Sequence, residues 1–536
     1  MREAQDALLT ADAGIFQRGG QLVRIVRLEE RTERAGIQRA AGSVIITPIT
    51  REYLILALAR AAAWKRYDGR AKKLINADPP GGVAGALLAM VGEWRFPVLS
   101  GLTAAPTLRA DGSLLDCAGY DPPSGLYGAF ERADFPDINP APTRDEALDA
   151  LAKLSELFEE CAFADWNPVQ DDSVDIAAKK SAHASVAIAA TITACVRHAL
   201  PTAPAFGVSA YKASSGKTTL ARTISHVCTG REPPVLALSD DETEFRKCLL
   251  GILIAGDACV LIDNVAHPVD SAALCAVLTN ASYADRVLGV NQKITVPTAS
   301  TWLLTGNHLE FVGDLTSRVL LSVLDPQVEH PEARKFNRDL AAYVAEHRGE
   351  IVAAALAVPL AYLAAGSPAC NAQPSRFTEW DRFVRRPLLW LGLADPLRTQ
   401  AELRAIDPVR TALIAVMVAW EETFGSEPTT VANAVEAATD VTVANMRIRL
   451  GLFEALAEIA GERNGSLNNR RLGRWLARHL RRIESGRRFE DAGEDLITHR
   501  RRFRVVSVSG VTGVTGVSGV SANPTREMSA TNGDGS

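Results

Sequence analysis

Near its centre the chain reads Gly207-Val-Ser-Ala-Tyr-Lys-Ala-Ser-Ser-Gly-Lys-Thr-Thr219. The apolar run at residues 206–210 is typical of a buried strand, and the residues after Thr219 favour a helix. A loop between a strand and a helix can point its backbone N–H groups at a phosphate held at the helix N-terminus. The sequence therefore predicts a phosphate-binding loop; a chance loop with a solvated lysine is the alternative.

The loop carries the residue types that bind a nucleoside triphosphate. Gly216 permits close backbone approach, Lys217 can reach the β- and γ-phosphates, and the Thr218 hydroxyl suits Mg²⁺. Tyr211 stands where the full G-x-x-x-x-G-K-[ST] pattern has its first glycine, and it packs either over the loop or near the base. We predict ATP and Mg²⁺ as ligands. The predicted contacts are Ser214, Ser215, Gly216, Lys217, Thr218 and Thr219.

A second apolar run, Ala258-Cys-Val-Leu-Ile-Asp263-Asn264, leads directly into an acid. It predicts a strand buried on both faces, with Asp263 at the carboxyl end where ligands of parallel sheets bind. Asp263 is then expected to hold Mg²⁺; an ordinary helix-capping aspartate is the alternative. Asn264 can orient water but cannot accept its proton.

Two further signals follow in order. The run Ser300-Thr-Trp-Leu-Leu-Thr-Gly-Asn307 ends a predicted strand in an amide that can touch the γ-phosphate or the attacking water. Arg318 precedes the apolar run 319–323 and can reach a phosphate in a neighbouring subunit. Alone, each residue fits an ordinary surface role. The order of loop, acid, amide and arginine, each beside a predicted strand, favours a catalytic set.

That order resembles the AAA+ class of ring ATPases, and particularly superfamily 3 helicases and the helicase part of phage or plasmid (prophage) primase-helicases. The resemblance implies that Lys217 and Thr218 belong to Walker A and that Asp263 and Asn264 form Walker B. It also implies that Asn307 is sensor 1 and Arg318 the arginine finger. The chain departs from the pattern at Tyr211 and at Asn264, where relatives often have a catalytic glutamate.

The resemblance also implies pore contacts with DNA between Asp263 and Asn307. The segment Ser282–Val296 reads as a hairpin that offers Arg286 and Lys293 to phosphates. A structural hairpin with solvated charges is the alternative.

The C-terminal part is strongly basic, with 13 arginines and five acids between Arg463 and Arg504. The helical pattern at Asn468–Ile483 and the strand-like run 503–507 suggest a winged helix with a DNA-recognition helix. Its predicted contacts are Arg471, Arg474 and Arg478. The alternative is a solvated basic helix that packs against the ATPase.

The composition of the chain excludes several other classes of protein. The 536 residues are 47% hydrophobic and 23% charged, which excludes wholesale disorder, and a net charge of −5 confines any nucleic-acid surface to a local patch. The eight cysteines form no CxxC pair, and apolar runs such as Ala184–Val196 are too short for a membrane span. We expect a cytoplasmic protein without membrane contact.

The predicted fold class is α/β, with a P-loop (AAA+-like) parallel sheet, a helical lid and a winged-helix-like module. Within the N-terminal α+β region, residues 52–67 read as a helix. The predicted parts are an N-terminal α+β adaptor or collar region (1–165), a helical linker (166–204), the ATPase core (205–330), a helical region (331–425), the basic module (426–505) and a disordered tail (506–536).

These observations favour an ATP-dependent DNA helicase or translocase of a mobile element, active in prophage or plasmid replication. We expect single-stranded DNA as partner and a hexamer-type homo-oligomeric ring. No paired carboxylates or zinc ribbon support a primase, so priming is expected from a separate protein. The alternative is an ATP-binding switch or loader that associates with DNA without unwinding it. A small-molecule kinase is disfavoured, because no acceptor-site aspartate follows the loop.

Overall fold

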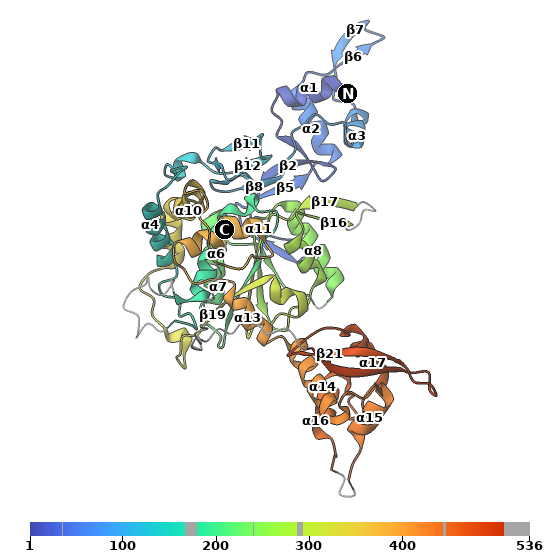
Figure 1. Ribbon diagram of the computed structural model, residues 1–536. Coiled ribbons are helices and arrows are strands. Elements are labelled where there is room, and N and C mark those ends of the chain that lie inside the picture. The colour runs from blue at the N-terminus through green and yellow to red at the C-terminus, as the bar shows by residue number, and fades with distance from the viewer. Residues whose placement is uncertain (35, 167–179, 240, 287–292, 443–445, 509–536) are drawn as a thin grey trace, which may run out of the picture. The chain divides into compact units, whose positions relative to one another are not determined.

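Figure 1 shows the computed structural model, which describes residues 1–34, 36–166, 180–239, 241–286, 293–442 and 446–508. The chain divides into two compact units, Met1–Asp407 and Pro408–Ser536. Most of the predicted tail and residues 167–179 of the predicted linker lie outside the described residues. No helix in the described part is long and apolar enough to cross a membrane.

The first unit is a mixed α/β structure built on a seven-stranded, mostly parallel sheet of order β19-β13-β18-β15-β14-β4-β3. The five strands β19 to β14 run parallel, and β4 and β3 add an antiparallel edge. The strand bounds are β3 (Thr32–Arg34), β4 (Ile37–Arg39), β13 (Ala205–Ala210), β14 (Val235–Leu236), β15 (Cys259–Val265), β18 (Thr301–Asn307) and β19 (Val319–Leu324).

Helices cover both faces of this sheet, as the alternation of its side chains requires. Leu261 of β15 packs with α6, α7 and α10, whereas its neighbours Val260 and Ile262 pack with α8 and α9. All 15 residues of α6 are buried, so the apolar run Ala184–Val196 belongs to a helix of the core. The helix bounds are α6 (Ala182–Val196), α7 (Lys217–Thr229), α8 (Glu242–Ala255), α9 (Ala272–Thr279) and α10 (Leu340–Ala364).

The N-terminal residues are not a separate body. Strand β4 pairs with β14, Ile37 is buried in the core of the sheet, and α4 packs against α10. The division between the two compact units falls at Asp407. The finer predicted boundaries at residues 165 and 204 remain predictions. The bounds are α1 (Arg2–Thr10), β1 (Ile15–Arg18), β2 (Gln21–Arg27), β5 (Val44–Pro48), α2 (Arg51–Ala61), β6 (Lys65–Asp68), β7 (Lys73–Asn76), α3 (Gly81–Ala89), β8 (Gly101–Thr103), β9 (Thr107–Leu108), β10 (Leu114–Leu115), β11 (Gly119–Asp121), β12 (Leu126–Gly128) and α4 (Arg144–Glu156).

The helix expected at residues 52–67 is too long. Helix α2 ends at Ala61, because Ala62 adopts an extended backbone with φ −152° and ψ 152°. The Trp64 indole then donates a hydrogen bond back to the carbonyl of Leu58 at 2.9 Å, which fixes the chain reversal. Residues 65–68 continue as strand β6 instead of a helix.

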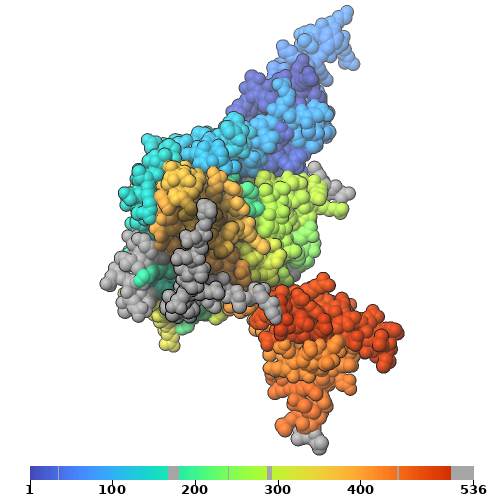
Figure 2. All heavy atoms as spheres, in the orientation of Figure 1, coloured from blue at the N-terminus to red at the C-terminus, as the bar shows by residue number. Residues whose placement is uncertain are grey.

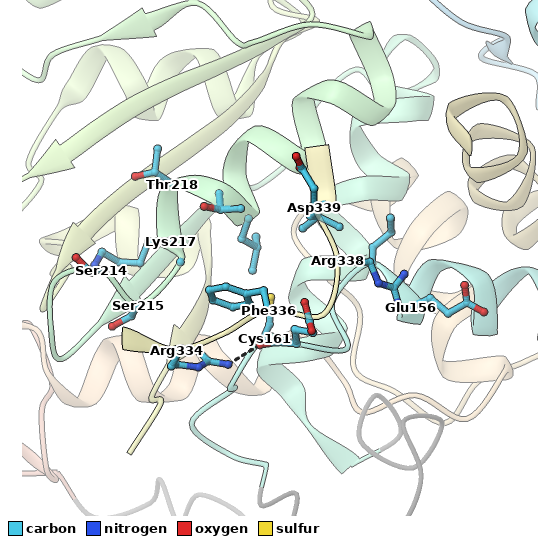
Figure 3. A pocket seen from close by; sticks show the side chains of 16 residues that line it. Glu156, Cys161, Ser214, Ser215, Lys217, Thr218, Arg334, Phe336, Arg338 and Asp339 are labelled. Carbon is cyan, nitrogen blue, oxygen red and sulfur yellow. Dashed lines mark hydrogen bonds between the residues drawn. The ribbon is translucent and has the colours of Figure 1, made fainter. Parts of the chain in front are cut away.

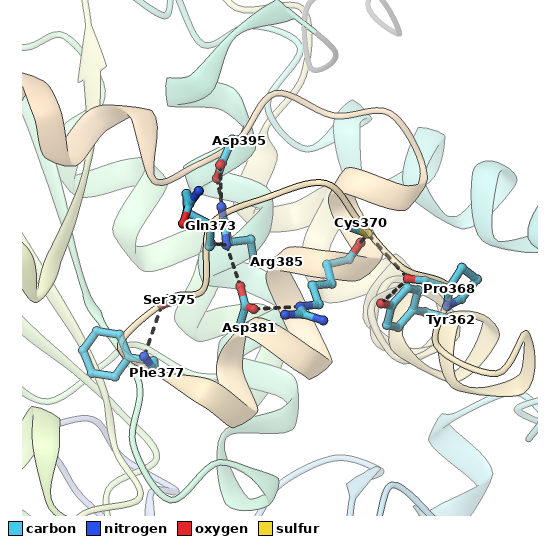
Figure 4. A network of polar contacts seen from close by, with 10 residues as sticks. Tyr362, Pro368, Cys370, Gln373, Ser375, Phe377, Asp381, Arg385 and Asp395 are labelled. Atoms are coloured by element: carbon cyan, nitrogen blue, oxygen red, sulfur yellow. Dashed lines mark hydrogen bonds and ion pairs between the residues drawn. The ribbon is translucent and has the colours of Figure 1, made fainter. Parts of the chain in front are cut away.

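A buried ion network holds the segment after α10 (Figure 4). Arg385 Nη1 lies 2.7 Å from Asp381 Oδ1, and Arg385 Nη2 lies 2.6 Å from Asp395 Oδ2. Arg386 Nε contacts the second oxygen of Asp381 at 2.8 Å. Each buried charge thus has an opposite partner, as burial requires. The helices here are α11 (Thr378–Trp380), α12 (Arg386–Trp390) and α13 (Arg398–Ala405).

The second unit is a small helical body with a three-stranded antiparallel sheet of order β20-β22-β21. Trp420 is fully buried at its centre and meets Phe489 of the sheet edge-on. The unit begins with α14 at Pro408, 18 residues before the predicted boundary at 426. The bounds are α14 (Pro408–Phe424), β20 (Thr429–Thr430), α15 (Val431–Thr439), α16 (Leu450–Ala460), α17 (Asn469–Arg478), β21 (Arg487–Glu494) and β22 (Arg501–Ser507).

Candidate functional site

The predicted phosphate loop joins β13 to α7. Gly216 adopts φ 93° immediately before Lys217, the first residue of the helix, and Ser214 has φ 58°. A Cβ at Gly216 would meet no atom within 4 Å, so the glycine is needed there for its left-handed backbone and not for space. The Ser215 hydroxyl donates to the Lys212 carbonyl at 2.8 Å and closes the loop. The first N–H groups of α7 have no partner within the helix, as at every helix N-terminus.

Four predicted residues meet where the parallel strands end. Lys217 Nζ lies 2.8 Å from Asn307 Oδ1, and the Thr218 hydroxyl donates to Asp263 Oδ1 at 3.1 Å. Ala210 and Asn307 are register partners at the ends of β13 and β18. Burial lowers the pKa of Lys217, and the nearby Asp263 carboxylate opposes that shift.

Asp263 and Asn264 lie on a bulge of β15, where the register with β18 shifts between Ile262 and Val265. Asn264 has φ 55°, a left-handed conformation that asparagine tolerates better than most residues. Its N–H donates to Asp263 Oδ1 at 3.1 Å and to the Thr305 hydroxyl at 3.2 Å. The Asn264 residue is exposed. The bulge therefore aims the acid at Thr218 and leaves the amide facing outward.

Thr305 joins this cluster of candidate residues, although it was not among the residues predicted from the sequence. Its hydroxyl donates a hydrogen bond to Asp263 Oδ1. It lies two residues before Asn307 on the same strand and hence on the same face of β18. The two-residue spacing between Thr305 and Asn307 was the signal in the sequence that could have identified Thr305.

No group of three or more His, Cys, Asp or Glu side chains in the described part of the chain could hold a metal ion by itself. The Thr218 hydroxyl and the Asp263 carboxylate nevertheless offer adjacent oxygen donors. One carboxylate and one hydroxyl fit Mg²⁺, which keeps several waters and shares substrate phosphates.

Arg318 lies away from these residues. It directly precedes β19, and its carbonyl accepts from the N–H of Ala205, the first residue of β13. The loop leaves β13 at the other end, after Ala210, about 17 Å away at 3.3 Å per residue. Arg318 Nη2 contacts Asp314 Oδ2 at 2.9 Å, and its Nε is buried without a hydrogen-bond partner among the described residues.

A pocket of about 450 Å³ opens beside the loop (Figure 3). Three segments line it: residues 156–161, the loop with the first turn of α7, and residues 334–340. The Phe336 ring lies between the loop and Cys161, and the Arg334 guanidinium lies 5.1 Å from the ring centroid. Burial raises the pKa of the Cys161 thiol to about 12, so this thiol stays protonated at neutral pH. Tyr211 is exposed beside His308 and does not line this pocket.

The predicted DNA contacts Arg286 and Lys293 face each other across an antiparallel hairpin of β16 (Ser282–Arg286) and β17 (Lys293–Pro297). Both are exposed, and the tip between them, residues 287–292, lies outside the described residues. Tyr283, whose hydroxyl donates to Asp285 at 3.1 Å, is half-buried.

The basic C-terminal unit has two kinds of arginine. Four of the five strand arginines are paired with acids: Arg487 with Glu421, Arg488 and Arg504 with Glu490, and Arg501 with Asp491. The fifth, Arg502, donates to the Ala492 carbonyl. The helix α17 arginines are exposed and have no ion pair within the described residues. They are Arg470, Arg471, Arg474 and Arg478.

The helix itself is shorter than the predicted Asn468–Ile483. It ends at Arg478, and Arg481, with φ 65°, lies in the turn between the helix and β21.

Comparisons with known proteins give limited similarity. No known family pattern and no curated protein matches the chain. Among solved structures, the C-terminal region of NrS-1 is similar at 9% identity and a TM-score of 0.35, over 94% of this chain and 99% of that one. The JCV helicase is similar at 13% identity and a TM-score of 0.21, over 47% of this chain and 67% of that one.

Proposed function

We propose that the chain is an ATPase that acts as a DNA helicase or translocase and hydrolyses ATP between the subunits of a homo-oligomeric ring. The observation that carries the proposal is the meeting of Lys217 with Asn307 and of Thr218 with Asp263 at one edge of the sheet. A lysine, a hydroxyl, a carboxylate and an amide at a helix N-terminus are the parts that phosphoryl transfer needs.

The chain's own residues bind and orient the triphosphate. The N–H groups that begin α7 receive the phosphates, and a phosphate oxygen takes the place of Asn307 as partner of the Lys217 ammonium. Thr218 and Asp263 would hold Mg²⁺, which when bound neutralises charge on the phosphates. Asn307 is then free to orient the attacking water or to contact the γ-phosphate.

The neighbouring pocket suits the nucleoside. Its volume of about 450 Å³ falls within the usual range for small-molecule sites. Leu157, Leu220 and Leu340 supply an apolar lining, and the Phe336 ring can stack on a base. ATP is the proposed substrate.

The position of Arg318 supports hydrolysis between subunits. Within one chain it lies at the sheet edge opposite the loop, so it serves a nucleotide only from a neighbouring copy. The Asp314 carboxylate contacts Nη2 of the guanidinium, and Nε has no hydrogen-bond partner among the described residues, so it can still donate to a neighbouring copy.

Mixing two inactive variants tests this proposal. Lys217→Ala removes ATP binding and Arg318→Ala spares binding but removes turnover. An equimolar mixture should regain activity, because a Lys217→Ala subunit offers Arg318 to an intact loop next to it. The matched control mixes Arg318→Ala with the Lys217→Ala/Arg318→Ala double variant, which should stay inactive. Turnover by the Arg318→Ala variant alone at the wild-type rate would overturn the proposal.

Asn264 favours a second candidate, an ATP-binding switch or loader on DNA. The residue after the Asp263 carboxylate is an exposed amide that cannot accept a proton from water. ATP binding with negligible turnover, unaffected by single-stranded DNA, would select this candidate.

A further inference from the structure

The antiparallel hairpin of β6 and β7 is a surface that the proposed function does not use. Its register pairs Lys65 with Asn76, Tyr67 with Leu74, and Asp68 with Lys73. In Figure 1 it extends beyond α1 and α2. At its base the Ala77 N–H donates to the Trp64 carbonyl at 3.0 Å, and Trp64 packs against the cluster around α1, α2 and α3. The hairpin is thus anchored at one end and free at the other.

The hairpin is strongly basic although the whole chain is acidic. Between residues 65 and 76 there is one acid, Asp68, whose Oδ1 accepts the N–H groups of Arg70 and Ala71 and shapes the turn. The five cations are all exposed, and none has an ion pair within the described residues. They are Lys65, Arg66, Arg70, Lys72 and Lys73.

One face of this ribbon also carries exposed apolar side chains. Tyr67 is 66% exposed and its cross-strand partner Leu74 is 62% exposed. Cross-strand partners share a face, so Tyr67 and Leu74 form one patch, with Lys65 next along the same face. Single exposed hydrophobic residues are common on protein surfaces. Here an aromatic residue and an aliphatic residue lie side by side among cations, as on surfaces that bind unpaired nucleotides.

We infer that the β6–β7 hairpin binds single-stranded nucleic acid, with a base stacked on Tyr67 and Leu74 and the phosphates against Lys65, Arg70 and Lys72. Duplex fits less well, because its bases are already stacked and offer no free face to Tyr67. The contact requires no ATP and involves none of the residues of the proposed ATPase site. It adds a nucleic-acid contact to the proposed function. The two can be tested separately, because the hairpin can bind nucleic acid whether or not the chain hydrolyses ATP.

The first test measures affinity without nucleotide. Fluorescein-labelled dT20 is titrated with full-length protein, and anisotropy is recorded at several salt concentrations. The Lys65→Gln/Arg70→Gln/Lys72→Gln variant should bind more weakly, and its salt slope should fall by about 2, at about 0.7 per lost phosphate contact. Tyr67→Ala should weaken binding about 5-fold or more without changing that slope.

A matched control removes three exposed cations elsewhere, Arg376→Gln/Arg398→Gln/Arg404→Gln, and should leave affinity nearly unchanged. Equal losses in both triple variants would overturn the inference. The inference would also be overturned if the hairpin substitutions weakened the binding of a 20-base-pair duplex as strongly as they weaken the binding of dT20. Unchanged dT20 binding combined with hairpin-dependent binding of polyglutamate would assign the surface to an acidic protein instead.

A local readout separates the hairpin from other basic surfaces. An oligonucleotide carrying 5-iododeoxyuridine is crosslinked by ultraviolet light and the adducts are mapped by mass spectrometry. Adducts on Tyr67 are expected, and they should persist in the Lys217→Ala variant, which lacks ATP binding. Adducts confined to other segments would overturn the inference while leaving the proposed ATPase intact. If the wild-type protein carried Tyr67 adducts but hydrolysed no ATP, the proposed ATPase would be overturned and this inference would remain.

Discussion

Asn264 directly follows Asp263, and its exposed amide cannot accept a proton from water. The bulge that presents it gives the residue φ 55°, which asparagine tolerates and which costs most other residues about 1 kcal/mol. The same geometry that leaves the site with an amide therefore also favours asparagine over glutamate at this position.

Asn264→Glu should raise ATP turnover, because a carboxylate can accept the proton of the attacking water; general-base catalysis contributes about 100-fold or more. The variant should lose about 1 kcal/mol of unfolding free energy to backbone strain. Asn264→Gln carries the same strain without a base and should show no gain in steady-state turnover. Equal turnover in the two variants would mean that water is activated elsewhere.

His198 gives the first unit a pH-dependent stability. Burial lowers its pKa to about 4, and its Nε2 lies 2.8 Å from the Leu102 carbonyl, so the neutral ring donates from Nε2. The unfolded histidine titrates near 6.5. Its stabilising contribution is complete above about pH 6.5 and is lost as pH falls toward 4, since the unfolded chain then binds the proton that the native chain excludes.

Chemical denaturation of the wild type and of His198→Gln between pH 4 and 7 measures this effect. The unfolding free energy of the variant should fall less steeply with decreasing pH. Parallel pH profiles would show that folding does not lower the pKa of His198.

At the scale of elements, the segment 377–395 depends on the Arg385 network. Burial lowers the pKa of Arg385, but Asp395 and Asp381 more than offset this, so the pKa is raised overall. Arg385→Ala leaves two carboxylates without their partner and should destabilise the protein by about 3–5 kcal/mol. Arg382→Ala, which breaks a half-exposed pair with Glu379, should cost about 0–1 kcal/mol. Similar losses in thermal or denaturant unfolding would contradict this account.

We propose that helix α17 is the DNA-recognition helix. Arg471→Gln/Arg474→Gln/Arg478→Gln should weaken duplex binding and reduce its salt slope by up to about 3, at about 0.9 per phosphate contact. Arg487→Gln/Arg488→Gln/Arg501→Gln removes the same charge from arginines already paired with acids and should change binding less. If the strand variant lost as much affinity as the helix variant, α17 would have no special role.

The sequence sufficed for elements whose signal is local. The apolar runs at β13, β15, β18 and β19 predicted strands because these strands are buried on both faces. The end of α2 was missed, since the extended backbone of Ala62 and the Trp64 hydrogen bond leave no mark in helical periodicity.

Features that depend on distant segments could not be predicted. The pairing of β4 with β14 joins residues about 200 positions apart in the chain. The pocket beside the loop likewise combines three separate segments, and Phe336 became a candidate only once they were placed together.

At the scale of the whole molecule, one copy of the chain does not contain a complete set of residues for the proposed hydrolysis. Lys217 and Arg318 lie at opposite edges of the same sheet, and the proposed chemistry needs both at one phosphate. Activity should therefore depend on assembly, and in a helicase it should also depend on a nucleic-acid strand.

Steady-state ATP hydrolysis across protein concentration, with and without single-stranded DNA, tests this central claim most directly. We predict that turnover per subunit rises cooperatively with protein concentration and is stimulated by DNA. Turnover per subunit that is constant with concentration and indifferent to DNA would contradict a ring-forming helicase or translocase.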